Sequence, residues 1–165
     1  MKRLIGLITF LVVLLTACGS QKPQANISKE LGIDVSKGTE VSNFDNHGGF
    51  HGDGMTYITL SFSDEKVLKT IEDKPEWKQF PLDETVKALV YGVSNDGSRV
   101  GPFLSDENGN GVVPEIENGY YLLIDRQAEP GKATGADILN RSSFNFTLGI
   151  YDTDTNTLHF LKLDT

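Results

Sequence analysis

The chain contains a single cysteine among its 165 residues, so an intrachain disulfide is excluded. The common catalytic motifs are also missing: we find no G-x-S-x-G, no H-E-x-x-H and no phosphate-binding G-x-x-x-x-G-K-[ST]. A carboxylate pair for glycoside hydrolysis stays open, because nothing singles out two of the 23 acids. We therefore expect no catalytic residue that the sequence can name; whether the protein is an enzyme stays open, with a non-enzymatic protein favoured.

Basic residues are few. The 15 lysines and arginines are outnumbered by 23 aspartates and glutamates, which gives a formal charge of −8. Nucleic-acid binding needs clustered lysine and arginine, so the composition argues against a nucleic-acid partner. It also argues against adhesion to anionic lipid through a basic patch.

Long apolar runs are limited to one, the twelve residues Leu4–Leu15, which follow two basic residues. This run is shorter than the roughly 20 residues that span a bilayer, and it has the length of the apolar core of an export signal. The next residues complete the tetrapeptide Leu-Thr-Ala-Cys at positions 15–18. An ordinary secretory signal or an N-terminal anchor helix would leave the lone cysteine unexplained.

This tetrapeptide resembles the lipobox of bacterial lipoproteins. The resemblance implies cleavage between Ala17 and Cys18 and a diacylglyceryl thioether on Cys18, with acyl chains such as palmitate. Two or more chains make membrane anchoring stable, so the formal charge of −10 left after cleavage need not prevent it. We expect a protein held on the extracytoplasmic face of the cell membrane.

The remaining sequence indicates one domain. We predict a signal peptide over 1–17, a lipidated flexible tether over 18–30 because of its polar composition, and a single domain over 31–165. No internal repeat and no second linker divide that domain.

Hydrophobic patterning predicts an α+β fold. Alternating or continuous apolar residues predict strands over 39–44, 55–62, 119–125, 143–151 and 157–163, with a turn at 152–156. Helices are predicted over 64–72, capped by Ser63, and over 83–91, ended by Gly92. The order is β-β-α-α-β-β-β, and the segregation of strands from helices favours an antiparallel sheet of about five strands with two helices.

A glycine-rich segment over 45–54 carries a first candidate metal site. Asp45, His47, His51 and Asp53 offer ligands suited to zinc or another transition metal. Four glycines prevent a helix here, so the spacing of the two histidines does not by itself bring them together. The alternative is a glycine-rich hairpin loop whose polar residues satisfy the turn.

A second candidate site follows the calcium-loop pattern. Asp106, Asn108, Asn110 and Glu117 fit D-x-[DN]-x-[DN]-G-x₅-E, and their oxygen ligands suit calcium. However, glycines and prolines break any preceding helix, and an apolar strand pattern follows. The alternative is an Asn-Gly-rich surface turn.

Several stretches resemble small uncharacterised lipoproteins of Gram-positive bacteria: HGGFHGDG at 47–54, NGYY at 118–121, DR at 125–126 and FNFTLGIYDTDTNTL at 144–158. That resemblance implies an exported lipoprotein and brings no catalytic residue. We expect a non-enzymatic module that binds a protein, glycan or small ligand. A metal-binding, even hydrolytic, protein and a calcium-stabilised surface domain remain as alternatives.

Overall fold

The computed structural model describes residues 22–48, 51–95, 97–128 and 137–165. Its helices are α2 (Pro23–Leu31), α3 (Lys66–Glu72), α4 (Glu84–Val90) and the 3-10 segment η1 (Ile138–Asn140). Its strands are β1 (Thr39–Asp45), β2 (Gly54–Ser61), β3 (Lys78–Gln79), β4 (Val93–Asn95), β5 (Ser98–Val100), β6 (Gly119–Asp125), β7 (Asn145–Asp152) and β8 (Thr157–Asp164). The predicted α+β class is confirmed.

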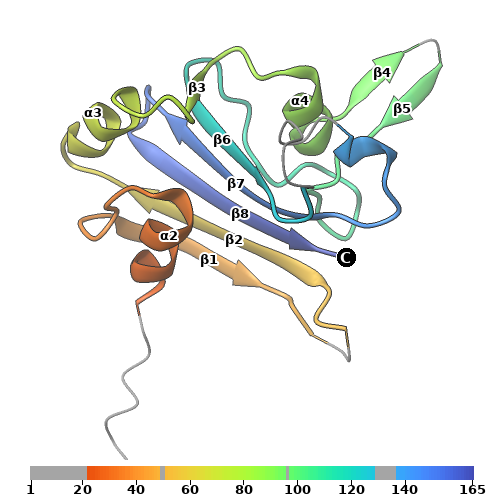
Figure 1. Ribbon diagram of the computed structural model, residues 1–165, viewed down its shortest axis with the longest axis horizontal. Coiled ribbons are helices and arrows are strands. Elements are labelled where there is room, and N and C mark those ends of the chain that lie inside the picture. The colour runs from red at the N-terminus through yellow and green to blue at the C-terminus, as the bar shows by residue number, and fades with distance from the viewer. Residues whose placement is uncertain (1–21, 49–50, 96, 129–136) are drawn as a thin grey trace, which may run out of the picture.

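The strands form a six-stranded sheet in the order β1-β2-β8-β7-β6-β3, and every neighbouring pair is antiparallel (Figure 1). A separate hairpin pairs β4 with β5. All five predicted strands are present, but the predicted counts and order are wrong in detail. The sequence analysis missed β3, β4 and β5, which have two or three residues each. Strands this short show no alternating pattern.

The β7–β8 hairpin forms where it was predicted, with its turn at the expected residues. Asp152 pairs with Thr157 at its end, and Asn156 adopts a left-handed backbone with φ 51°. The carboxylate of Asp152 accepts hydrogen bonds from the Asp154 amide at 2.8 Å and from the Thr155 hydroxyl at 2.7 Å. These side chains therefore stabilise a tight turn, as expected for aspartate and asparagine.

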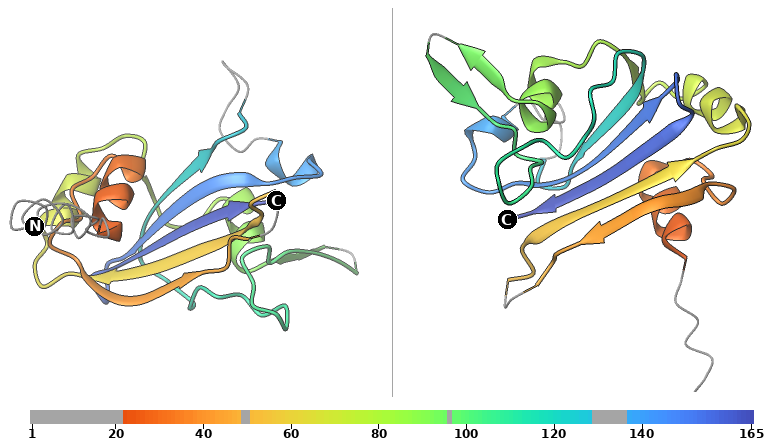
Figure 2. Two further views of the ribbon diagram at one scale, coloured as in Figure 1. Left: turned by 90° about the horizontal axis from the view of Figure 1, so that it is seen from below. Right: turned by 180° about the vertical axis from the view of Figure 1, so that it is seen from behind.

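Both faces of the sheet are covered across its central strands, each by its own core, whereas edge strand β1 is exposed. On one face α2, α3 and Trp77 cover Ile58, Leu122 and Phe160, among others. On the other face α4 and the long 101–118 segment cover a second set, which includes Phe146, Leu148, Ile150, Leu161 and Leu163. Figure 2 shows α2 and α3 together at one end of the twisted sheet. Phe160 and Leu161, which are neighbours on β8, therefore lie in different cores.

Helix α2 corrects the predicted tether. Residues 23–30 were expected to be flexible, but Pro23–Leu31 form a helix whose Ile27 and Leu31 are each 1 % exposed. The proline stands in the first turn, where its missing N–H costs nothing, and Gly32 ends the helix with φ 66°. The tether prediction is thus wrong from residue 23 onward, because two apolar side chains one turn apart are enough to dock this polar segment.

The other two helices lie where they were predicted, with shorter bounds. Asp83 caps α4 by accepting the Val86 amide at 2.9 Å, and Gly92 follows it with φ 76°. Helix α3 begins at Lys66, so Ser63 is not its cap; instead Asp64 accepts the Lys66 amide at 3.1 Å. The single tryptophan, Trp77, is buried in the first core.

Candidate functional site

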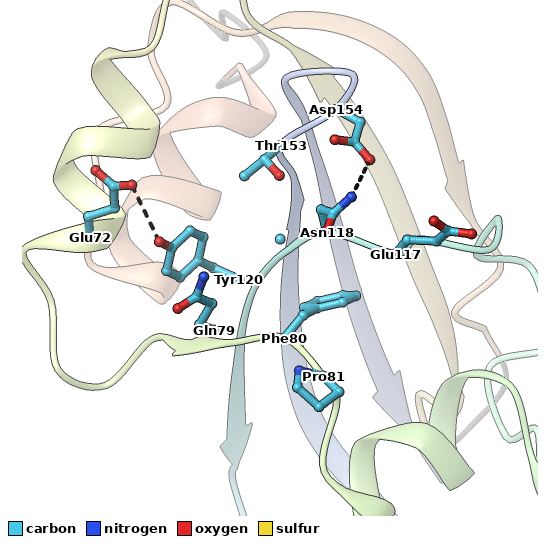
Figure 3. Close-up of a pocket in the computed structure, with 10 residues that line it drawn as sticks. Glu72, Gln79, Phe80, Pro81, Glu117, Asn118, Tyr120, Thr153 and Asp154 are labelled. Atoms are coloured by element: carbon cyan, nitrogen blue, oxygen red, sulfur yellow. Dashed lines mark hydrogen bonds between the residues drawn. The ribbon is translucent and has the colours of Figure 1, made fainter.

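A groove of about 540 Å³ lies at the β3 edge of the sheet (Figure 3). Four elements contribute to it: the end of α3, β3 and the residues after it, the start of β6, and the β7–β8 turn. Its lining includes the side chains of Glu72, Phe80, Pro81, Glu117, Asn118, Tyr120, Thr153 and Asp154. The segments come from distant parts of the sequence, so only the folded sheet assembles this groove.

The backbone segments beneath the groove are packed closely against one another. The Phe80 amide donates to the Gly119 carbonyl at 2.9 Å, and the Phe80–Pro81 peptide bond is cis. A Cβ at Gly119 would lie 2.1 Å from the carbonyl oxygen of Tyr151, so only glycine fits there. This close approach brings β6 and β7 together at the base of the groove.

The polar groups of the groove are paired with one another at its rim. The Tyr120 hydroxyl donates to Glu72 at 3.3 Å, and the Asn118 amide donates to Asp154 at 3.0 Å, as the dashed lines in Figure 3 mark. Desolvation and the nearby Glu72 carboxylate raise the pKa of Tyr120. The tyrosine therefore stays a neutral hydrogen-bond donor at physiological pH, and both carboxylates keep lone pairs for a ligand.

A second hollow of about 390 Å³ continues from the first and shares Phe80, Pro81 and Glu117 with it. Its wall is fixed by Tyr91, whose hydroxyl donates to the Pro114 carbonyl at 2.8 Å. The described residues that line the two hollows include the carboxylates of Glu72, Glu84, Glu115, Glu117 and Asp154 and a single basic side chain, Lys87.

The combined groove, which we call the β3-edge groove, thus presents oxygen acceptors beside aromatic faces. Phe80 lines both hollows, while Tyr120 and Tyr91 line one each. Such a surface attracts positive charge and hydrogen-bond donors, and it repels anions.

The predicted metal segment is partly brought together. His47 Nδ1 lies 2.7 Å from Asp45 Oδ1, and His47 Nε2 lies 3.1 Å from Oδ2 of Asp164 at the end of β8. Asp164 in turn pairs with Arg126 at 2.8 Å. The backbone amide of His47, followed by its side chain, lowers the pKa of Asp45. His47 therefore joins the β1–β2 connection to the last strand.

The other two predicted ligands lie in the loop between β1 and β2. His51 and Asp53 are exposed, and the Asp53 backbone carbonyl accepts the Gly48 amide at 3.2 Å, as in a hairpin loop. In the described parts of the chain, no group of three or more histidine, cysteine, aspartate or glutamate side chains is arranged to hold a metal ion.

The predicted calcium segment forms a closed turn. One carboxylate oxygen of Asp106 accepts the backbone amides of Asn108 at 2.9 Å and Asn110 at 2.8 Å, and these bonds lower the pKa of Asp106. A bridge between Ser105 and Gly111 closes its base. Glu117 lines the β3-edge groove instead. Asp106, Asn108 and Asn110 are therefore brought together in an Asx-type turn.

Two further residues, Cys18 and His159, have side chains with distinctive chemistry. Cys18 and Ala17 lie outside the described residues, so lipidation stays a prediction. His159 is buried in β8, where its Nδ1 lies 2.8 Å from the Tyr57 hydroxyl, and burial lowers its pKa. It therefore packs within the fold.

The sequence analysis did not find the β3-edge groove or the role of Asp164. The groove's aromatic and acidic residues are spread over 83 positions between Glu72 and Asp154, and no short motif links them. Comparison with known proteins gives no match to a protein family, a curated protein or a solved structure. Among the described residues no helix is long and apolar enough to cross a bilayer.

Proposed function

We propose that this protein is an exported lipoprotein, anchored through Cys18 on the outer face of the cell membrane, and that its domain is a non-enzymatic ligand-binding module. The lipobox-like Leu-Thr-Ala-Cys and the single cysteine support the anchor. The β3-edge groove supports binding, because it is a concave surface where aromatic and polar side chains from several elements converge.

The single observation that carries the ligand class is the composition of that groove. Five carboxylates and one lysine line it together with Phe80, Tyr91 and Tyr120. An amine-bearing ligand gains charge-assisted hydrogen bonds from the carboxylates and contacts with the ring faces. We therefore assign small cationic ligands to this groove, with phosphates and carboxylates excluded by repulsion.

A titration with spermidine tests this assignment. Amide signals of Asn118, Gly119 and Asp154 are expected to shift on adding spermidine, and to stay in place on adding citrate. The Glu117→Gln variant should weaken the response, whereas Glu107→Gln, an exposed carboxylate in the Asp106 turn, should leave it unchanged. Shifts spread evenly over the acidic surface would overturn the groove as a site.

The anchor has its own test. In cells that process lipoproteins, the Cys18→Ser chain should remain uncleaved, and the wild-type protein should carry the mass of its acyl chains. A wild-type mature protein with no added lipid mass would contradict the anchor and leave the groove assignment standing.

Metal binding is a second candidate, supported by the contacts of His47 with Asp45 and with Asp164, which are two pairs rather than a complete ligand set. Binding to the native state raises thermal stability by mass action, so melting with EDTA, zinc or calcium separates the options. A rise in melting temperature with zinc that His47→Ala removes would support the glycine-rich segment, and a rise with calcium that Asp106→Asn removes would support the second segment. No shift with either ion would contradict both.

A further inference from the structure

The position of α2 bears on how the anchored domain is oriented. If Cys18 carries the lipid, as proposed above, only four peptide units separate it from Lys22, the first described residue. Four extended residues span at most about 14 Å. The N-terminal end of α2 must then stay within that distance of the membrane interface, since the remaining chain allows no greater reach.

Helix α2 cannot swing on the domain to relieve this restraint. Its buried Ile27 and Leu31 pack into the first core, and Ser28 accepts the Val35 amide at 3.0 Å. Glu30 accepts the hydroxyl of Thr147 at 2.9 Å. Because the helix is fixed to the sheet, the short connection fixes the whole domain relative to the membrane, within the freedom of a few residues.

The N-terminal end of α2 lies beside β1. A hollow of about 560 Å³ between helix and sheet is lined by Lys22, Pro23 and Asn26 from the helix side and by Glu40, Asn43 and Asp45 from β1. Strand β1 is exposed along its whole length and stands at the edge of the sheet (Figure 1). We call the start of α2 together with β1 the α2–β1 surface.

The β3-edge groove lies toward the other end of α2. A Cβ at Gly32, just after the helix, would be 3.8 Å from Lys74 Nζ, and Lys74 is two residues beyond the groove residue Glu72. The nine residues of α2 span about 13 Å, which separates its N-terminal end from this side. Figures 1 and 2 agree, since α2 begins on the side of the molecule away from β3 and α4.

The distribution of charge favours the part of the chain with α2 and β1 as the part nearer the membrane. Residues 22–48, which include α2 and β1, hold three lysines and four acids, a net charge of −1. Residues 49–165 hold ten basic and 19 acidic residues, a net charge of −9. An anionic membrane surface repels the second part far more than the first. Lys22 and Lys29 are both exposed on α2.

We infer that the α2–β1 surface faces the lipid headgroups and that the β3-edge groove opens away from the membrane. The inference rests on the proposed anchor at Cys18 and names the bilayer surface as the partner of β1. It also places the proposed cation-binding groove where ligands arrive from outside the cell.

The orientation can be tested without the cell's own lipidation. A chain that begins at Cys18 keeps both cores, which lie between Ile27 and Leu163. Its thiol is coupled to a maleimide lipid in nanodiscs, some of which carry a gadolinium-chelating headgroup. We expect loss of the amide signals of Asn26 and Asn43 in the gadolinium discs and retention of those of Gly119 and Asp154.

A control variant carries 20 Gly-Ser residues between positions 20 and 21, a linker with a root-mean-square length of about 25 Å. In this variant the amide signals of Asn26 and Asn43 should no longer be lost selectively. Equal broadening of both groups in the unmodified chain, or selective loss at the groove, would overturn the orientation. Absence of acyl mass on Cys18 in cells would instead contradict the proposed anchor, so the two failures are distinguishable.

Discussion

A methyl group added at Gly149 would collide with the core on the α2 side of the sheet. The new Cβ would lie 2.8 Å from Trp77 Cη2 and 3.1 Å from both terminal methyl carbons of Leu31. Trp77 is 5 % exposed and Leu31 is 1 % exposed, so neither has open space to move into. Gly149 is therefore the place where β7 lets the tryptophan and α2 approach the sheet.

The expected change in the free energy of unfolding of Gly149→Ala is the difference between two opposing effects. Overpacking a dense core costs about 1–3 kcal/mol. Replacing glycine in a strand returns about 0.5–1 kcal/mol of backbone entropy, and Gly149 has no positive φ to forbid alanine. We expect Gly149→Ala to lower the free energy of unfolding by about 1–2 kcal/mol, or the melting temperature by roughly 2–8 °C.

Trp77 is the only tryptophan, so its fluorescence reports this core during urea or thermal unfolding. Gly48→Ala is the matched control, because the nearest atom to its added Cβ is 3.9 Å away. Leu31→Ala should make room for the methyl group, so the double variant should be more stable than the sum of the two single effects predicts. Wild-type stability in Gly149→Ala, or strict additivity in the double variant, would refute the close packing.

Three other variants test separate parts of the fold. Gly119→Ala should destabilise the protein by about 3 kcal/mol in urea unfolding, because its Cβ would lie 2.1 Å from a backbone oxygen of β7; an unchanged midpoint would contradict the β6–β7 register. Burial lowers the pKa of His159, so near pH 6.5 the unfolded state binds a proton more readily than the native state. The free energy of unfolding should therefore fall as pH drops below about 6.5. His159→Gln should reduce that fall between pH 7.5 and 5, and an equal slope in both proteins would count against it. Asp106→Ala should speed hydrogen exchange at the amides of Asn108 and Asn110 with little change in melting temperature, and unaltered exchange would mean that the carboxylate does not hold the turn.

Helices and strands with a clear hydrophobic periodicity were predicted at the correct positions in the sequence. The β7–β8 hairpin alternates cleanly and has a turn rich in aspartate and asparagine, so both strands and the turn were predicted. Helix α2 was missed because Gln24, Asn26 and Ser28 gave it the composition of a linker. A proline in the first turn, Ile27 and Leu31 one turn apart, and Gly32 at the end were a helix signal in the same residues.

Contacts between distant residues could not be predicted in this way. His47 and Asp164 are 117 positions apart and meet only because β8 pairs with β2. The β3-edge groove depends likewise on β3, whose two residues are too few to show a pattern. The sequence therefore indicated local structure well, whereas the candidate site arises from sheet order.

The central place of β8 in the sheet affects when the protein can fold. This strand is the last along the chain, yet it lies between β2 and β7 and joins the β1–β2 pair to the β6–β7 pair. Until it has been synthesised, the two halves of the sheet have no shared strand, and both cores lack residues such as Phe160 and Leu161. Closure of the sheet must therefore wait until β8 has been synthesised, so contacts between segments far apart in the sequence form late in folding.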